Sequence, residues 1–269
     1  MRVASLAVLA CLLSIAPAWG QQSSGDWKVE RFEHTLPLSE GASVRVENPR
    51  GNLWVRTHHE PGVYLLVHVQ RHPDDPREVD LSLSQTEEEL GIDIAFAQVE
   101  VDVEPDAWTK RRVDVTVFVP PTTPTHFSTA TGLLEVLGTH GPTEVETASG
   151  DIRLRIHGTA TAQSEHGSVL AQFMRTDWSR PVEITTSTGA IRVEMPDGGR
   201  AEVVAETRGE ISSDFSTEIE WLEAALLKRA TLSVGEHGVP MKLMSHQGSI
   251  KVLQSLVPTE DKSATNDGD

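Results

Sequence analysis

Residues 145–154 read VETASGDIRL, and residues 184–193 read ITTSTGAIRV. In both stretches an apolar residue lies five positions before a glycine, and further apolar residues lie two and four positions after it. Similar units surround six glycines, with successive spacings of 18, 17, 22, 20 and 39 residues: Gly132, Gly150, Gly167, Gly189, Gly209 and Gly248. A period of about twenty residues is typical of repeat proteins, in which one unit cannot bury its apolar side alone and neighbouring units stack into a continuous core.

Within each unit, apolar and polar side chains alternate, which is the pattern of a β-strand. After the glycine, the residues predicted to point inward are Leu134, Val136, Ile152, Leu154, Val169, Ala171, Ile191, Val193, Ile250 and Val252. The residues predicted to point outward are Glu135, Asp151, Arg153, Ser168, Arg192, Glu210 and Lys251. Before the glycine, the predicted inward positions are Val145, Ala162, Ile184, Val204 and Leu243. Each unit therefore predicts two short strands that meet at a Ser/Thr/Gly corner, where glycine suits a positive φ.

The last spacing, 39 residues, is about two periods. Residues 229–234 read RATLSV and supply a candidate for the missing unit, with Ala230 in the position of the glycine. Leu232 and Val234 then occupy the two inward positions. This interpretation predicts one more coil between those of Gly209 and Gly248.

The preceding part of the chain has longer alternating segments. Ser43–Val46 and Leu53–Val55 flank Gly51 and predict a first coil, with Trp54 pointing outward. Further strands are predicted at 63–69, 79–83, 92–96, 99–103 and 113–119, so that residues 25–122 form wider coils or hairpins that close the N-terminal end. Residues 213–228 leave two alternatives open, a short helix over Glu220–Lys228 or a strand and loop.

Six segments carry a resemblance to a known family: VENPRGNLWV (46–55), VDVTVFVPP (113–121), TATG (129–132), TASGDIRL (147–154), STGAIRV (187–193) and SVGEHGVPMKLMSHQGSIKVL (233–253). Together they resemble the DUF4097 family of proposed bacterial adhesins and the related auto-transporter adhesin head domains. The resemblance covers nearly all of the mature chain. It implies an all-β, single-stranded β-solenoid, similar to a parallel β-helix, on the outer side of the cytoplasmic membrane. It brings no catalytic residues with it.

The N-terminus has the features of a secretory signal peptide. Arg2 precedes the apolar run Val3–Ile15, which is too short to span a membrane, and Ala18-Trp19-Gly20 predicts cleavage after Gly20. Lipidation of Cys11, the single cysteine of the chain, is the alternative. The predicted organisation is a signal peptide over 1–20, an adhesin-like β-solenoid over 25–253 and a disordered acidic tail over 254–269, in a protein exported to the periplasm or the cell surface.

The formal net charge is −17. It argues against nucleic-acid binding, which requires a basic surface, and against docking to anionic lipid headgroups. The acidic residues are dispersed and match no calcium loop, so they favour solubility over cation capture. We therefore expect no nucleic acid, no membrane span after signal cleavage and no metal. The expected partner is an unidentified envelope protein or a glycan.

Three kinds of residue are candidates for a functional site. His140, His157, His166 and His237 each precede a glycine, and stacking could align the first three, but their spacing fits no zinc pattern. For a glycosidase or lyase, two carboxylates must face one cleft; the outward acids are Glu135, Asp151 and Glu210, with Arg153 and Arg192 available for a uronic acid. Trp54, Trp178 and Trp221 are candidates for stacking on sugars, although packing is the commoner role.

No nucleophile, phosphate-loop or dinucleotide motif occurs. We accordingly expect no catalytic, cofactor-binding or metal-binding residues and no cofactor. The sequence favours an exported, non-catalytic protein with an adhesin-like or structural role. A polysaccharide-active β-helix enzyme and an envelope-homeostasis factor are the alternatives.

Overall fold

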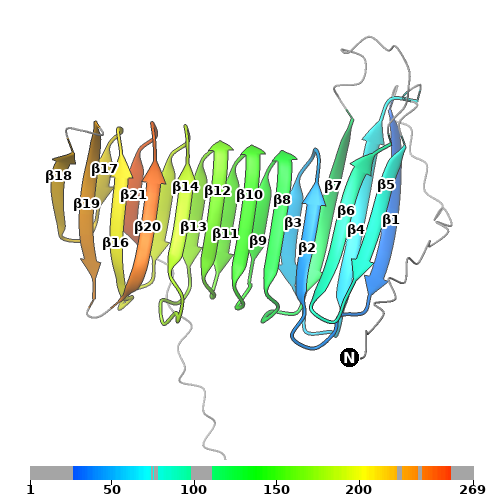
Figure 1. Cartoon of the computed structure of the whole chain (residues 1–269), viewed down its shortest axis with the longest axis horizontal. Coiled ribbons are helices and arrows are strands. Elements are labelled where there is room, and N and C mark those ends of the chain that lie inside the picture. Colours follow the sequence, from blue (N-terminus) through cyan, green and yellow to red (C-terminus); the bar gives the residue numbers. More distant parts are fainter. Residues whose placement is uncertain are drawn as a thin grey trace, which may run out of the picture.

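The structure, a computed structural model, describes residues 27–73, 75, 78–97, 111–222, 226–235 and 238–255. This part of the chain is all-β: it contains strands and turns but no helix, and the strands form two large sheets. Figure 1 shows an elongated molecule whose strands run across its long axis. The prediction of an all-β protein is confirmed.

The two sheets, A and B, each contain strands from throughout the chain. In spatial order, sheet A consists of β1 (Lys28–Leu36), β4 (Val63–Arg71), β7 (Arg112–Val119), β3 (Leu53–Thr57), β9 (Leu134–Leu137), β11 (Ile152–Ile156), β13 (Val169–Phe173), β15 (Ile191–Met195), β21 (Ile250–Gln254) and β17 (Ile211–Ser213). Sheet B consists of β18 (Thr217–Leu222), β19 (Leu227–Val234), β16 (Ala201–Thr207), β20 (Val239–Ser245), β14 (Val182–Thr186), β12 (Ala160–His166), β10 (Thr143–Ser149), β8 (Thr125–Thr131), β2 (Ser43–Asn48), β6 (Glu89–Phe96) and β5 (Val79–Gln85).

Most of the molecule is built from pairs of consecutive strands, one in each sheet, which we call rungs. In the rung β10/β11, the chain leaves sheet B at Ser149, turns at Gly150 and enters sheet A at Ile152. Neighbouring rungs stack in parallel register, so that Ile152 lies beside Leu134 on one side and Val169 on the other. The sequence pattern therefore recurs at the same height in each rung.

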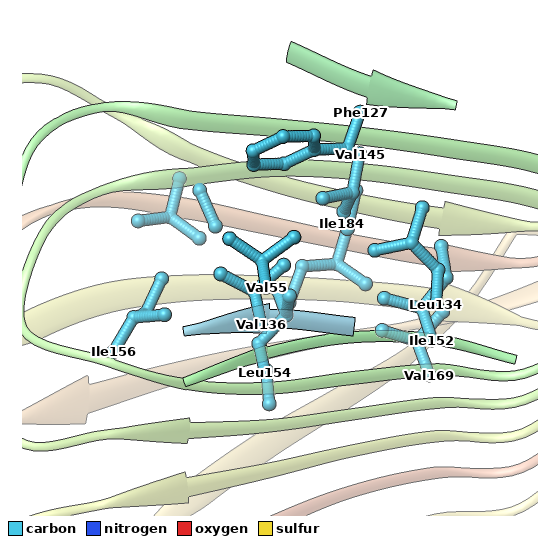
Figure 2. Close-up of a cluster of buried hydrophobic side chains, with 14 of the residues drawn as sticks. Val55, Phe127, Leu134, Val136, Val145, Ile152, Leu154, Ile156, Val169 and Ile184 are labelled. Atoms are coloured by element: carbon cyan, nitrogen blue, oxygen red, sulfur yellow. The ribbon is translucent and has the colours of Figure 1, made fainter. Parts of the chain in front are cut away.

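The inward side chains of both sheets form one hydrophobic core (Figure 2). All ten inward residues predicted after the glycines are buried, and so are Val145, Ala162, Ile184 and Leu243. The residues between them are exposed or half-buried, as the alternation predicts. Trp54 points away from the core and is half-buried, which confirms its predicted direction.

The corner glycines are required by close approach between rungs. A Cβ atom on Gly167 would lie 1.9 Å from the carbonyl oxygen of Gly150, a distance that no side chain tolerates. The expected positive φ is wrong for most of these corners: of the six repeat glycines, only Gly132 has one.

A buried hydroxyl reinforces most of these corners. Thr186 Oγ1 donates to the carbonyl oxygen of Gly167 at 2.9 Å, and Ser164 Oγ donates to that of Gly150 at 3.1 Å. The same bond joins Ser245 to Gly189, Thr129 to Gly51 and Thr207 to Gly248. We call this column of bonds the hydroxyl ladder. It gives each of these glycine carbonyl groups a hydrogen-bond donor from a neighbouring rung.

Two predictions inside the repeat region are wrong. Val204 is half-buried, and its neighbours Val203 and Ala205 face the core instead. The corner before Gly209 is one residue shorter than the others. Its buried hydroxyl residue, Thr207, lies two positions before the glycine, whereas Thr186 lies three positions before Gly189. The residues before the corner are therefore shifted by one position.

Ala230 does not form a corner. It lies within β19, where it is buried opposite Ala205 of the antiparallel strand β16. Leu232 and Val234 do face the core. The rung that follows β14/β15 in space is instead β20/β21, whose Gly248 stacks on Gly189.

The order of the rungs departs from the order of the chain at both ends. β20/β21 lies between β14/β15 and β16/β17, and β2/β3 lies between β6/β7 and β8/β9. The outermost strands β1, β4, β5, β18 and β19 pair antiparallel. A single-stranded solenoid is therefore not confirmed, because the chain does not wind as one continuous coil and both sheets are mixed.

Some of the remaining predictions concern described residues and can be compared with the structure, and others lie outside the described residues. The strands predicted at 43–46, 53–55, 63–69, 79–83, 92–96 and 113–119 are present, and in the part described residues 213–228 form strands and a turn, not a helix. The predicted strand at 99–103, the signal peptide and nearly all of the tail lie outside the described residues. Within the described ranges, no helix of sufficient length and hydropathy to cross a membrane occurs.

Candidate binding face

The outer faces of the two sheets differ in the charges that stay unpaired. On sheet A, the outward ion pairs are Arg31–Glu33, Arg56–Glu135, Arg112–Asp114 and Arg192–Glu194. The outward charged residues that make no hydrogen bond or ion pair to another described residue are Arg153, Arg155 and Lys251, and all three are exposed. We call this surface the basic face.

Sheet B has the opposite excess. Its outward cationic groups are paired, with Arg45 between Glu47, Glu89 and Asp93, Lys242 on Glu183, and Arg229 between Glu206 and Glu220. Among the described residues of this face, the exposed carboxylates without a partner are those of Asp80, Glu146, Glu165, Glu202 and Glu218. We call this surface the acidic face. Although the net charge of the chain is negative, the unpaired positive and negative groups described here lie on opposite faces of the molecule.

Strand register places the unpaired arginines near Trp54. Trp54 lies opposite Glu135, and Glu135 lies opposite Arg153. Trp54 and Arg153 are thus two strands apart, about 10 Å at the usual strand spacing. Arg155 follows Arg153 on the same face of β11, about 7 Å further along the strand.

Two further aromatic side chains continue the surface toward β4. Tyr64 and Phe118 lie opposite each other on β4 and β7, with ring centroids 5.7 Å apart, and both are half-buried. A hydrogen bond to Glu33 raises the pKa of the Tyr64 hydroxyl above its ordinary value.

A hollow of about 350 Å³ opens beside these rings. It is lined by Thr35, His58, Glu60, Pro61, Val63, Tyr64 and Phe118. The His58 ring packs on the edge of Phe118 at 6.4 Å, and its Nε2 atom lies 3.2 Å from the carbonyl oxygen of Gly62. The basic face thus combines a shallow aromatic hollow, an indole ring and two free guanidinium groups.

Such an arrangement can hold a flat ligand that carries carboxylates. Guanidinium groups bind carboxylates through two parallel hydrogen bonds, and partly exposed aromatic rings offer an apolar surface with a polar edge. The strands that carry Trp54, Arg153 and Arg155 each pair in parallel with a neighbour on both sides, so these side chains are held on a rigid support.

The candidate histidines separate into two groups. His140 and His157 come from successive corners, and their rings are in contact with centroids 4.4 Å apart and planes tilted by 44°. His166 ends β12, beside the corner of Gly167 at the opposite edge of the sheets, and His237 lies outside the described residues. In the described part of the chain, no three His, Cys, Asp or Glu side chains are placed to hold a metal ion.

The candidate carboxylates do not converge on one cleft. Glu135 pairs with Arg56, and Asp151 Oδ1 accepts a hydrogen bond from the backbone N–H of Ser168 at 2.9 Å. Asp151 and Glu210 precede strands β11 and β17, which are four strands apart, or about 19 Å. Glycosidase carboxylates are typically about 5 to 9.5 Å apart.

The three candidate tryptophans lie in different surroundings. Trp178 is buried and packs on Phe173, Trp54 is half-buried on the basic face, and Trp221 is exposed on β18. Sequence analysis missed Arg155, Tyr64 and Phe118 as candidates. The alternation that identified Arg153 and Trp54 as outward also applies to these residues, but their meeting on one face depends on pairing between distant strands.

Comparison with known proteins leaves the family open. No family model matches the sequence, and no curated protein matches it, so membership of the DUF4097 family stays a prediction. Among solved structures, the chain is similar to a proposed cell adhesion protein from Clostridium sporogenes, with 12% identity over 85% of this chain and 100% of that one and a TM-score of 0.48. It is also similar to a proposed adhesin from Bacteroides fragilis, with 9% identity, coverage of 85% and 97% and a TM-score of 0.28. A proposed lipid-binding protein from Parabacteroides distasonis shares 11% identity, with coverage of 83% and 96% and a TM-score of 0.26.

Proposed function

We propose that this protein is an exported, non-catalytic binding protein of the cell envelope, and that its basic face holds an acidic glycan. The observation that carries the proposal is the presence of two arginines without a described partner, Arg153 and Arg155, on the same face as the half-buried Trp54. A guanidinium group that has no partner in the protein and is held on a rigid sheet can donate its hydrogen bonds to a carboxylate of a ligand.

A glycan with spaced carboxylates matches this surface in chemistry. Each sugar ring has a flat C–H side that fits against an indole or phenyl ring, and a uronic acid adds one carboxylate per ring. Strand register places Trp54, Arg153, Arg192 and Lys251 in one row across sheet A. Arg153 and Arg192 are two strands apart, about 10 Å, and Arg192 and Lys251 are one strand apart, about 5 Å. A chain lying along the molecule meets them in sequence.

The charge balance separates such a glycan from denser polyanions. Duplex DNA carries one charge per about 1.7 Å of axis, and its binding requires a broad basic surface. Among the described residues of the basic face, three unpaired cations stand against a net charge of −17 for the whole chain. The surface therefore favours a ligand with few, separated negative charges.

We also propose that the fold is a solenoid. The parallel rungs, with period-two burial and stacked corner glycines, support a solenoid whose ends are closed by antiparallel strands. Export rests on the predicted signal peptide over 1–20. N-terminal sequencing of the protein recovered from the periplasm or medium should begin at Gln21.

The binding proposal is tested by titrating the mature protein with polygalacturonate and with dextran, a neutral polysaccharide. We expect binding to polygalacturonate that weakens as salt is raised, no binding to dextran, and no new reducing ends after prolonged incubation. Equal binding to both polymers would contradict the proposal. Release of reducing ends or unsaturated products would favour the polysaccharide-active enzyme instead.

A further inference from the structure

Three large apolar side chains are more than half exposed in the described part of the chain, and all three belong to one hairpin. Ile219 and Trp221 lie on β18, with 54% and 52% of their surface exposed, and Leu226 precedes β19 with 59% exposed. Most apolar residues of comparable size are buried in the core. This end of the molecule therefore presents an apolar surface to solvent.

The hairpin is also the end of sheet B. β18 pairs with β19 on one side, and none of the described strands pairs with its other side, as the left end of Figure 1 shows. Sheet B extends past sheet A here, because β19 and β18 follow β16 whereas sheet A ends at β17. The backbone groups along the outer edge of β18 are consequently available to pair with another strand.

The two sides of β18 differ in chemistry. Thr217 and Ile219 lie opposite the core residues Leu232 and Ala230, so Ile219 and Trp221 are on the side that continues the core surface. Glu218 and Glu220 are on the other side, which continues the acidic face. Glu218 has no described partner, and Glu220 shares Arg229 with Glu206.

We infer that β18 is a docking edge for an extended peptide segment of another protein that alternates cationic and apolar residues. Strand addition would satisfy the free backbone groups, place the apolar residues beside Ile219 and Trp221, and bring the cationic residues opposite Glu218 and Glu220. Charge complementarity selects this partner over a second copy of the chain. An antiparallel pair of two β18 strands that preserved their faces and was centred on Ile219 would set Glu218 opposite Glu220 of the other copy, and like charges in that position are destabilising.

The test uses the full mature chain and two blocked synthetic peptides, Thr-Lys-Val-Lys-Val-Lys-Thr and the same peptide with Glu in place of Lys. The variant E218K/E220K reverses the charge of the edge at exposed positions. The matched control, E146K/E165K, makes the same change of net charge on the acidic face, away from the edge. Affinity is measured by calorimetry, and light scattering reports the oligomeric state.

We expect the unmodified protein to bind the Lys peptide and not the Glu peptide. E218K/E220K should weaken binding of the Lys peptide about tenfold, or about 1.4 kcal/mol, and bind the Glu peptide, whereas E146K/E165K should keep the original preference. Absence of binding to the Lys peptide would overturn the inference. So would an equal loss in both double variants, or a stable dimer that dissociates on E218K/E220K substitution.

Discussion

Thr186 donates its hydroxyl to the carbonyl oxygen of Gly167 in the preceding rung, at 2.9 Å, and the hydroxyl of Thr147 in the corresponding corner position has no hydrogen-bond partner. Both threonines are buried, with 3% and 4% of their surface exposed. The Thr186 hydroxyl also accepts a hydrogen bond from the N–H of Gly189 at 3.1 Å. The two residues thus provide a matched pair for measuring what the hydrogen bonds of one corner hydroxyl contribute.

Replacing Thr186 with valine should lower the free energy of unfolding by about 1–2 kcal/mol, because the shape of the side chain is kept while two hydrogen bonds are lost, the one donated to Gly167 and the one accepted from the Gly189 N–H. The same change at Thr147 should leave stability unchanged or raise it, because a methyl group replaces a hydroxyl that is buried without a partner. Urea denaturation of both variants provides the comparison. Equal losses would show that the ladder bonds do not contribute to stability.

The corner glycines should be far less tolerant of a side chain than a surface glycine. Gly167→Ala should cost about 3 kcal/mol or more, because the new Cβ would lie 1.9 Å from the Gly150 oxygen and the rungs would have to separate. Gly198→Ala is the control: it has a positive φ of 68° but nothing near its Cβ position, so it should cost about 1 kcal/mol. Thermal unfolding of the two variants should therefore differ clearly. Similar melting temperatures would contradict the close-approach explanation.

The division between inward and outward residues predicts opposite results at adjacent positions. Ile152→Asp should prevent folding, because it removes about 1.5–3 kcal/mol of apolar burial and places a carboxylate in the core. Arg153→Ala should leave the melting temperature nearly unchanged, since this side chain is exposed and without a described partner. Circular dichroism and thermal unfolding distinguish the two. A folded Ile152→Asp variant would refute the assignment of this strand.

Stability should also depend on pH through Glu30. Burial raises the pKa of Glu30, but the hydrogen bond from Lys28 and the charge of Arg71 outweigh it and bring the pKa below its ordinary value of 4.5. A carboxyl group whose pKa is lower in the folded state stabilises the fold above its unfolded pKa, and this contribution is lost as the pH falls through the folded pKa. Glu30→Gln should thus be less stable than the unmodified protein at pH 7, and the difference should shrink toward pH 3. A difference that stays constant between these two pH values would show that this ionisation does not contribute.

The local pattern of the repeats predicted much of the fold. Alternation around each glycine placed Leu134, Ile152 and Ile250 correctly, because each strand buries one side and exposes the other. It failed at Val204, where the corner is one residue shorter. It also failed at Ala230, because apolar residues at the two following inward positions occur in any half-buried strand.

The arrangement of the rungs could not be predicted in the same way. Which strand lies beside β14 or β15 is decided by pairing between residues far apart in the chain, and β20/β21 and β16/β17 both offer compatible apolar surfaces. The candidate site depends on the same pairing, because Tyr64, Phe118 and Arg155 meet on one face only after β4, β7 and β11 have joined sheet A. Arg153 and Trp54 could be recognised as outward, but their neighbours could not.

The functional role of the basic face is tested most directly by removing charged groups from each of the two faces separately. Arg153→Gln with Arg155→Gln should weaken binding of polygalacturonate about tenfold or more, or at least about 1.4 kcal/mol, because two carboxylate partners are lost. The control, Glu146→Gln with Glu165→Gln, removes two unpaired charges from the acidic face and should keep the affinity or raise it slightly. Both double variants should retain the melting temperature of the unmodified protein. If the two pairs of substitutions changed the affinity equally, or if loss of the arginines left it unchanged, the basic face would not be the binding surface.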